Sequence, residues 1–200
     1  MARVIPWIFA DIGAPLCPLL FATDAQGVND VDAGGYGITM RAAPPALVRA
    51  VFERGSQVGM TVARLSGDQS GLRRPDKSTA PTVPFTMLPR ELFDLDEWIV
   101  IGHGRWLHPD HVTLGESRGV VKLLDIVTRG ASFHRVRLLS LQDNRPTSGA
   151  MTKGRSPSAP LNYLMRRRTA RTLASAIRMG LPWVESNKMP ADESSRVNAQ

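Results

Sequence analysis

The sequence predicts one domain of the α/β class, in which a mixed sheet of about five strands is flanked by helices. Short apolar runs bounded by turn residues alternate with longer segments of helical spacing, which is the pattern of such layered domains. The chain has 200 residues, 42% of them hydrophobic, enough for one sizeable core. We expect residues 1–15 to form a lead-in, 16–196 the domain and 197–200 a tail.

The predicted strands share short length, apolar or alternating residues and flanking turn formers. In chain order they are residues 19–24, 36–40, 98–102, 133–141 and 182–185. A segment rich in Gly, Asn and Asp separates the first two, so we expect them to form a hairpin. Two of these apolar runs end in an aspartate, Asp24 and Asp143, so we expect each aspartate to lie at the end of a strand.

Three segments have helical spacing, and their expected ends carry helix signals. They are residues 46–52, 111–128 and 159–179. Thr113 is the expected N-cap of the second helix, with Glu116 three residues on in a capping-box pattern. Gly180 follows the third helix as an expected C-terminal glycine. Residues 66–90, rich in proline and without periodicity, are expected to form an inserted loop that carries no chemistry.

The composition narrows the function classes. The formal net charge is +7, which favours a polyanionic partner such as nucleic acid, although arginines that solvate helix faces would give the same balance. The single cysteine, Cys17, excludes an internal disulfide and a cysteine zinc site. No run approaches the roughly 18 apolar residues of a membrane span, and prolines break the apolar N-terminal run, so we expect no membrane or signal segment. Cytoplasm and nucleus both remain open.

Four acidic residues are the candidate site: Asp24, Glu116, Asp143 and Asp192. Strand ends are where open α/β sheets bind ligands, which favours Asp24 and Asp143. Glu116 begins the helix stripe that faces the sheet, and a buried carboxylate needs a cation or hydrogen-bond partners. Taken singly, each acid has another interpretation, as a turn former, a strand terminator or a helix cap.

Carboxylates that converge from separate elements repel each other unless a cation lies between them. Hard oxygen donors suit Mg²⁺ or Mn²⁺ rather than zinc. Two such ions about 3.5–4 Å apart can activate a water and stabilise the leaving oxygen of a phosphoryl displacement. We therefore expect Mg²⁺ or Mn²⁺ as the cofactor, with two ions at the site.

Five short motifs occur in an order that resembles a known family. They are Thr23-Asp24-Ala25, His111 to Arg118, Asp143-Asn144, Lys153 to Ser156, and Pro190-Ala191-Asp192-Glu193-Ser194-Ser195-Arg196. Together they resemble the ribonuclease H domain of retroelement reverse-transcriptase polyproteins, over about residues 16 to 196. The chain departs from that family in its longer hairpin turn, its long segment before Glu116, Gly115 and Gly119 beside that glutamate, and Met189 where Asn is usual.

The resemblance implies a ribonuclease H-like fold and a metal-dependent endonuclease that hydrolyses the RNA strand of RNA–DNA hybrids. It implies Asp24, Glu116, Asp143 and Asp192 as metal ligands, and a parent chain in which this domain was fused to a reverse transcriptase. The expected nucleic-acid contacts are Asn144, Lys153, Arg155, Arg167 and Arg171. Two alternatives stay open: a non-catalytic or decayed binding module, and a transposase or exonuclease of the same fold.

Overall fold

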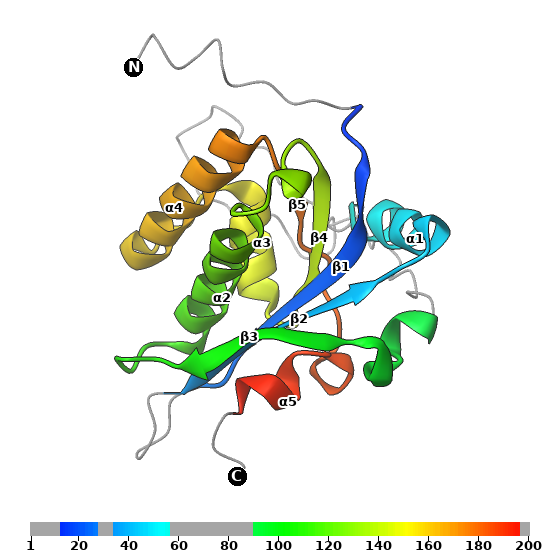
Figure 1. Cartoon of the computed structure of the whole chain (residues 1–200). Helices are drawn as coiled ribbons and strands as arrows, with labels where there is room; N and C mark the ends of the chain where they lie inside the picture. The colour runs from blue at the N-terminus through cyan, green and yellow to red at the C-terminus, as the bar shows by residue number, and fades with distance from the viewer. Residues whose placement is uncertain (1–12, 28–33, 57–89, 197–200) are drawn as a thin grey trace, which may run out of the picture.

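The computed structural model describes residues 13–27, 34–56 and 90–196. Its centre is a five-stranded mixed sheet in the order β3-β2-β1-β4-β5 (Figure 1). The strands are β1 (Leu16–Ala25), β2 (Gly35–Ala42), β3 (Ile99–Arg105), β4 (Arg137–Leu141) and β5 (Arg178–Gly180). The predicted α/β class and strand number are confirmed.

Strand pairing places the ends of β1 and β4 together. β1 pairs antiparallel with β2, and Asp24 lies opposite Gly37. On its other side β1 runs parallel to β4, with Ala22 opposite Leu141. Parallel strands bring their carboxyl ends to the same edge of a sheet, so the residues that follow Ala22 and Leu141 are neighbours in space.

Within the described residues, five α-helices pack against this sheet: α1 (Pro45–Ser56), α2 (Val112–Val127), α3 (Arg145–Lys153), α4 (Ala159–Ser175) and the short α5 (Asp192–Ser195). α2, α3 and α4 lie on one face and α1 on the other (Figure 1). Alternate residues of β1 serve the two faces, since Leu20 packs in the cluster that contains α1 and Phe21 in the cluster that contains α2. No helix in the described ranges is both long and apolar enough to cross a bilayer.

The C-terminal elements differ from expectation. α4 ends at Ser175, not at Met179, because Ala176 adopts a left-handed conformation (φ 52°) and its N–H bonds back to the carbonyls of Leu173 and Thr172. The chain then turns into β5, which occupies the place predicted for the end of the helix. The expected strand at 182–185 is reduced to a single bridge between Trp183 and Gln142.

Two further helix starts correct the prediction. The N-cap of α2 is His111, whose Nδ1 accepts from the Thr113 N–H at 3.2 Å, so Thr113 is not the cap. α3 is a helix that the sequence pattern did not predict. Asn144 caps it by accepting from the Thr147 N–H at 2.9 Å, and Pro146 lies in its first turn.

Some predictions concern residues that are not described or are described only in part. The inserted loop at 66–90 lies outside the described residues except for Arg90, as do the tail at 197–200 and residues 1–12 of the lead-in. The proposed domain boundaries therefore stay predictions.

Candidate metal centre

Asp24 lies one residue before the end of β1, where the strand is buried throughout from Leu20 to Ala25. The residue is only 5% exposed, and its carboxylate accepts a hydrogen bond from the Ser195 hydroxyl at 2.6 Å. Ser195 reaches it because α5 lies flat on β2. An added Cβ at Gly37 would overlap the Ala191 carbonyl and the Ser194 hydroxyl, so this close approach requires glycine.

Asp143 lies two residues after the end of β4 and is held by the segment that leads to α5. Its backbone carbonyl accepts from the Trp183 indole N–H at 2.7 Å. One carboxylate oxygen accepts from the Ser186 hydroxyl at 2.7 Å. The side chain is half-buried, so one side of this carboxylate remains open to a ligand.

Glu116 comes from the first turns of α2, on the stripe that faces the sheet. The capping-box role is wrong, because His111 caps the helix and Glu116 lies deeper within it. Instead its Oε1 accepts from the backbone N–H of Ala25 at 3.2 Å. Gly115 lets α2 approach this closely, since a Cβ there would lie 3.2 Å from the Ala25 Cβ.

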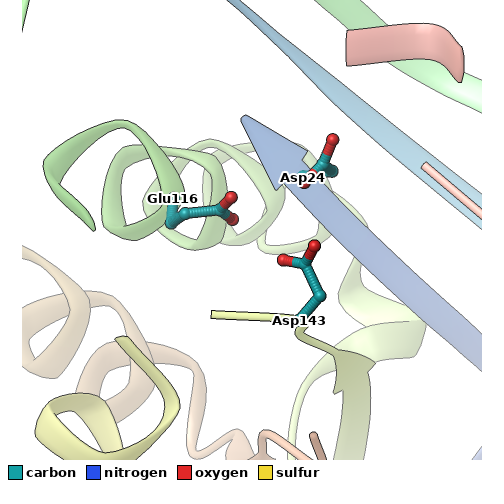
Figure 2. A group of neighbouring side chains, drawn as sticks. All are labelled: Asp24, Glu116 and Asp143. Atoms are coloured by element: carbon teal, nitrogen blue, oxygen red, sulfur yellow. The ribbon is translucent and has the colours of Figure 1, made fainter. Parts of the chain in front are cut away.

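These three elements bring three of the four predicted acids together. One carboxylate oxygen each from Asp24, Glu116 and Asp143 can be chosen so that all lie within 4.8 Å of one another. Figure 2 shows Glu116 pointing from α2 toward the end of β1, and Asp143 pointing toward the space between Glu116 and Asp24. Their role as metal ligands stays a prediction, but their convergence is a property of the fold.

Burial and mutual repulsion dominate the electrostatics. Burial raises the pKa of Asp24, the Ser195 hydrogen bond opposes that rise, and the charges of Asp143 and Asp192 add to it. The pKa of Glu116 is raised to about 10, first by burial and then by the charges of Asp24 and Asp143. At neutral pH the three carboxyl groups therefore cannot all be ionised unless a cation is bound.

The donor set fits a hard divalent cation. All three side chains offer carboxylate oxygens, the ligands that Mg²⁺ and Mn²⁺ prefer. Glu116 is 2% exposed, and its Oε2 has no hydrogen-bond partner among the described residues. A buried, unsatisfied carboxylate oxygen beside two other carboxylates is what a cation would neutralise. The described residues could hold Mg²⁺ or Mn²⁺ here.

The fourth predicted ligand, Asp192, lies outside this group of three. It is the first residue of α5, and its carboxylate binds the Arg196 guanidinium at 3.0 Å. Asp192 is still near enough for its charge to raise the pKa of Asp24. The structure thus places it beside the cluster rather than within it.

The predicted nucleic-acid residues divide into two groups. Lys153 and Arg155 line a hollow of about 560 Å³ between the start of α2, α3 and the start of α4. Arg145 also lines it, and none of its lining residues is acidic. We call this the basic hollow. Its cations give it a positive charge, and one of them, Arg145, follows Asp143 by two residues in the chain.

The other predicted contacts are already engaged within the protein. Asn144 caps α3 through its side chain. Arg171 forms an ion pair with Asp125, and Arg167 lies 4.0 Å from the same carboxylate. Both arginines remain at least partly exposed, so the prediction that they bind nucleic acid is neither confirmed nor contradicted.

Sequence reasoning missed the groups that hold the acids in place. Ser195 and Ser186 each bind a candidate ligand, and Gln142 joins the two strand ends. Ser195 stands in the last of the five motifs, three residues after Asp192, which was the one available signal. Nothing in the local sequence marks Ser186 or Gln142.

Comparison with known proteins places the fold. No family model and no curated protein matches the chain. Among solved structures, LC11-RNase H1 in complex with an RNA/DNA hybrid is 9% identical, with 90% of this chain and 94% of that chain covered and a TM-score of 0.50. That RNase H1 was isolated from compost by a metagenomic approach.

Two other solved structures match with lower TM-scores. The N-terminal RNase H domain of a Mycobacterium tuberculosis protein is 17% identical, with 90% of this chain and 91% of that chain covered and a TM-score of 0.49. The protease-reverse transcriptase of prototype foamy virus is 10% identical, with 96% of this chain but 20% of that chain covered and a TM-score of 0.41. The strand order and the match to LC11-RNase H1 together show that this chain has the ribonuclease H-like α/β fold.

Proposed function

We propose that this chain is a metal-dependent endonuclease that hydrolyses the RNA strand of RNA–DNA hybrids, and that it belongs to a retroelement reverse transcriptase of the cytoplasm or nucleus. The observation that carries the proposal is the convergence of Asp24, Glu116 and Asp143 at one edge of the sheet. The order of the five sequence motifs supports the retroelement context.

The chemistry of the site follows from its charge. Asp24, Glu116 and Asp143 would hold Mg²⁺ or Mn²⁺, which supplies the positive charge that activates a water and offsets the charge that develops on the phosphate. The protein fixes three carboxylates on three separate elements before substrate arrives. It also keeps Asp24 and Glu116 out of bulk water, which strengthens their attraction for a cation.

A nucleic-acid substrate agrees with the surface beside the acids. The basic hollow presents Arg145, Lys153 and Arg155 without an acidic neighbour in its lining, and such cations bind backbone phosphates. The structurally similar LC11-RNase H1 was solved with an RNA/DNA hybrid, which supports the hybrid as substrate.

The test is cleavage of a labelled RNA–DNA hybrid by the purified chain, with and without Mg²⁺. We expect RNA fragments only with the ion, and Asp143→Asn to abolish them while hybrid binding persists. Duplex DNA and substrates with free ends, tested in parallel, separate a transposase or exonuclease from the proposed enzyme. If the well-folded protein leaves the hybrid uncut in the presence of Mg²⁺, the proposed function is refuted.

One observation favours a second candidate, a non-catalytic nucleic-acid-binding module. Asp192 lies outside the cluster and is bound by Arg196, so one expected ligand is already engaged within the protein. Such a module would bind the hybrid with the affinity of the Asp143→Asn variant and release no RNA fragments under any metal condition.

A further inference from the structure

Two buried polar side chains directly precede two of the candidate ligands. Thr23 comes before Asp24, and Gln142 comes before Asp143. Both are 0% exposed, although each lies in a strand region whose neighbours are mostly apolar. The Gln142 amide donates to the Thr23 hydroxyl, so the pair connects the ends of β1 and β4.

This connection begins where the backbone pairing of the two strands stops. The last paired residues are Ala22 and Leu141. At Gln142 the backbone turns to the C-terminal segment instead, because its N–H bonds to the Pro182 carbonyl at 3.0 Å and its carbonyl accepts from Val184 at 2.8 Å. The side-chain amide of Gln142 therefore provides the contact with β1 that its backbone does not.

The amide has a geometry suited to fixing both strands. Besides the Thr23 hydroxyl, its nitrogen lies within hydrogen-bond distance of the Thr23 carbonyl at 3.4 Å and of the Leu141 carbonyl at 2.7 Å. One planar group thus contacts both strands one residue before their aspartates. A shift of either strand end would break at least one of these contacts.

The hydrogen bonds of Gln142 satisfy only part of its side chain. The Gln142 Oε1 is buried and has no partner among the described residues. Leaving a buried carbonyl oxygen without a hydrogen bond lowers stability. Packing therefore does not by itself account for a glutamine at this position.

We propose that Thr23 and Gln142 are positioning residues: their hydrogen bond sets the spacing of the Asp24 and Asp143 carboxylates and so the affinity of the site for divalent metal. The inference rests on the proposed function, because it assumes that these carboxylates bind metal together. We assign neither residue as a ligand, because Thr23 packs beneath α2, where a Cβ added at Gly119 would touch it, and the Gln142 amide nitrogen bonds to Thr23.

The test compares Gln142→Leu, Thr23→Val and Thr23→Ser with the wild-type chain. Mn²⁺ affinity is measured by calorimetry, and kcat and KM are measured on the hybrid. Thr39→Val is the matched control, because Thr39 is a buried threonine of the same sheet whose hydroxyl has no partner among the described residues. Melting temperatures report the structural effect of each change.

We expect Gln142→Leu and Thr23→Val to weaken Mn²⁺ binding about tenfold, as loss of groups that orient ligands does elsewhere. In these two variants kcat should fall while the KM for hybrid stays unchanged. Thr23→Ser should restore the Mn²⁺ affinity and kcat, and Thr39→Val should match the wild-type chain in both. If Gln142→Leu does not fold, Thr23→Val alone decides.

The outcomes separate the inference from the proposed function. The inference is overturned if a folded Gln142→Leu or Thr23→Val chain binds Mn²⁺ with wild-type affinity and differs only in a lower melting temperature. Thr23 and Gln142 would then contribute to packing alone. A wild-type chain that binds Mn²⁺ but cuts no hybrid refutes the proposed function. The Mn²⁺ affinities of the variants then still test the role of Thr23 and Gln142. A wild-type chain that binds no Mn²⁺ overturns both.

Discussion

Glu116 is buried beside two other carboxylates, and its protonation links the stability of the protein to its ligand. Its pKa is raised from 4.5 to about 10, with burial as the largest cause. A carboxyl group whose folded pKa lies above its unfolded pKa binds a proton more tightly in the folded state. Stability therefore falls as pH rises from near the unfolded value toward the folded one.

Glu116→Gln should therefore stabilise the chain when no divalent cation is present. At pH 7 in EDTA we expect a gain on the order of 1–3 kcal/mol in the free energy of unfolding, because glutamate is ionised in the unfolded chain and must take up a proton on folding, whereas glutamine need not. At pH 4 the gain should vanish, since glutamate is then protonated in both states. Urea unfolding at several pH values measures it, and a gain that does not depend on pH would contradict the assigned cause.

Divalent metal should reverse this penalty in the wild-type chain. A ligand that binds only the folded state stabilises it by about 2.7 kcal/mol at one hundred times its dissociation constant. We expect saturating Mn²⁺ to raise the wild-type melting temperature by several degrees and to leave that of Asp143→Asn nearly unchanged. Equal shifts in both proteins would place the bound ion elsewhere.

At the scale of the element, the two glycines of α2 that flank Glu116 have different surroundings. A Cβ at Gly119 would lie 3.6 Å from the Thr23 Cβ, an ordinary contact, whereas one at Gly115 would lie 3.2 Å from the Ala25 Cβ and 3.3 Å from the Trp106 Nε1. Alanine is favoured over glycine in a helix by about 1 kcal/mol. The crowding at Gly115 works against that gain.

Gly119→Ala should accordingly stabilise the chain by about 0.5–1 kcal/mol without changing metal affinity. Gly115→Ala should gain less or lose stability, and should weaken Mn²⁺ binding, because α2 must move away from Ala25 and carry Glu116 with it. Urea unfolding and Mn²⁺ titration of the two variants, each the other's control, measure this. The idea fails if Gly115→Ala binds Mn²⁺ as tightly as Gly119→Ala.

At the scale of the whole molecule, the elements with strong patterns could be predicted and those fixed by tertiary contacts could not. The apolar strands before Asp24 and Asp143 could be predicted, because both the apolar pattern and the residues that end it lie within a short stretch of sequence. The end of α4 was not, since Ala176 adopts a left-handed turn that sequence statistics assign to glycine. The hydrogen bond between Thr23 and Gln142 joins residues 119 positions apart, and no local pattern encodes it.

The acidic cluster was predictable in part for the same reason. Order and placement identified Asp24, Glu116 and Asp143, but the short helix that carries Asp192 takes its place from contacts with β2. Sequence order predicted that Asp192 belongs with the others, and the structure places it beside them. Sequence order could not show that Arg196 would bind the Asp192 carboxylate.

The distribution of charge over the molecule leads to a last prediction about substrate binding. Lys153 and Arg155 are exposed in the basic hollow and have no ion pair with any described residue, whereas Arg171 pairs with Asp125 and Arg167 lies close to it. Each cation that binds a phosphate releases counterions and steepens the salt dependence of affinity by about 0.9 in logarithmic slope. Only the cations without an ion pair should contribute fully to the salt dependence of binding.

We therefore expect Lys153→Gln/Arg155→Gln to lower the salt slope of hybrid binding by about 1.8 and to weaken binding most at low salt. Arg167→Gln/Arg171→Gln should lower it by less, because those guanidiniums must first leave Asp125. Arg49→Gln/Arg129→Gln, two exposed arginines outside the hollow's lining, is the control with equal charge loss. Binding is measured by fluorescence anisotropy in the inactive Asp143→Asn background, so that cleavage does not intervene. Equal slopes for all three double variants would mean that net charge, and not the basic hollow, attracts the nucleic acid.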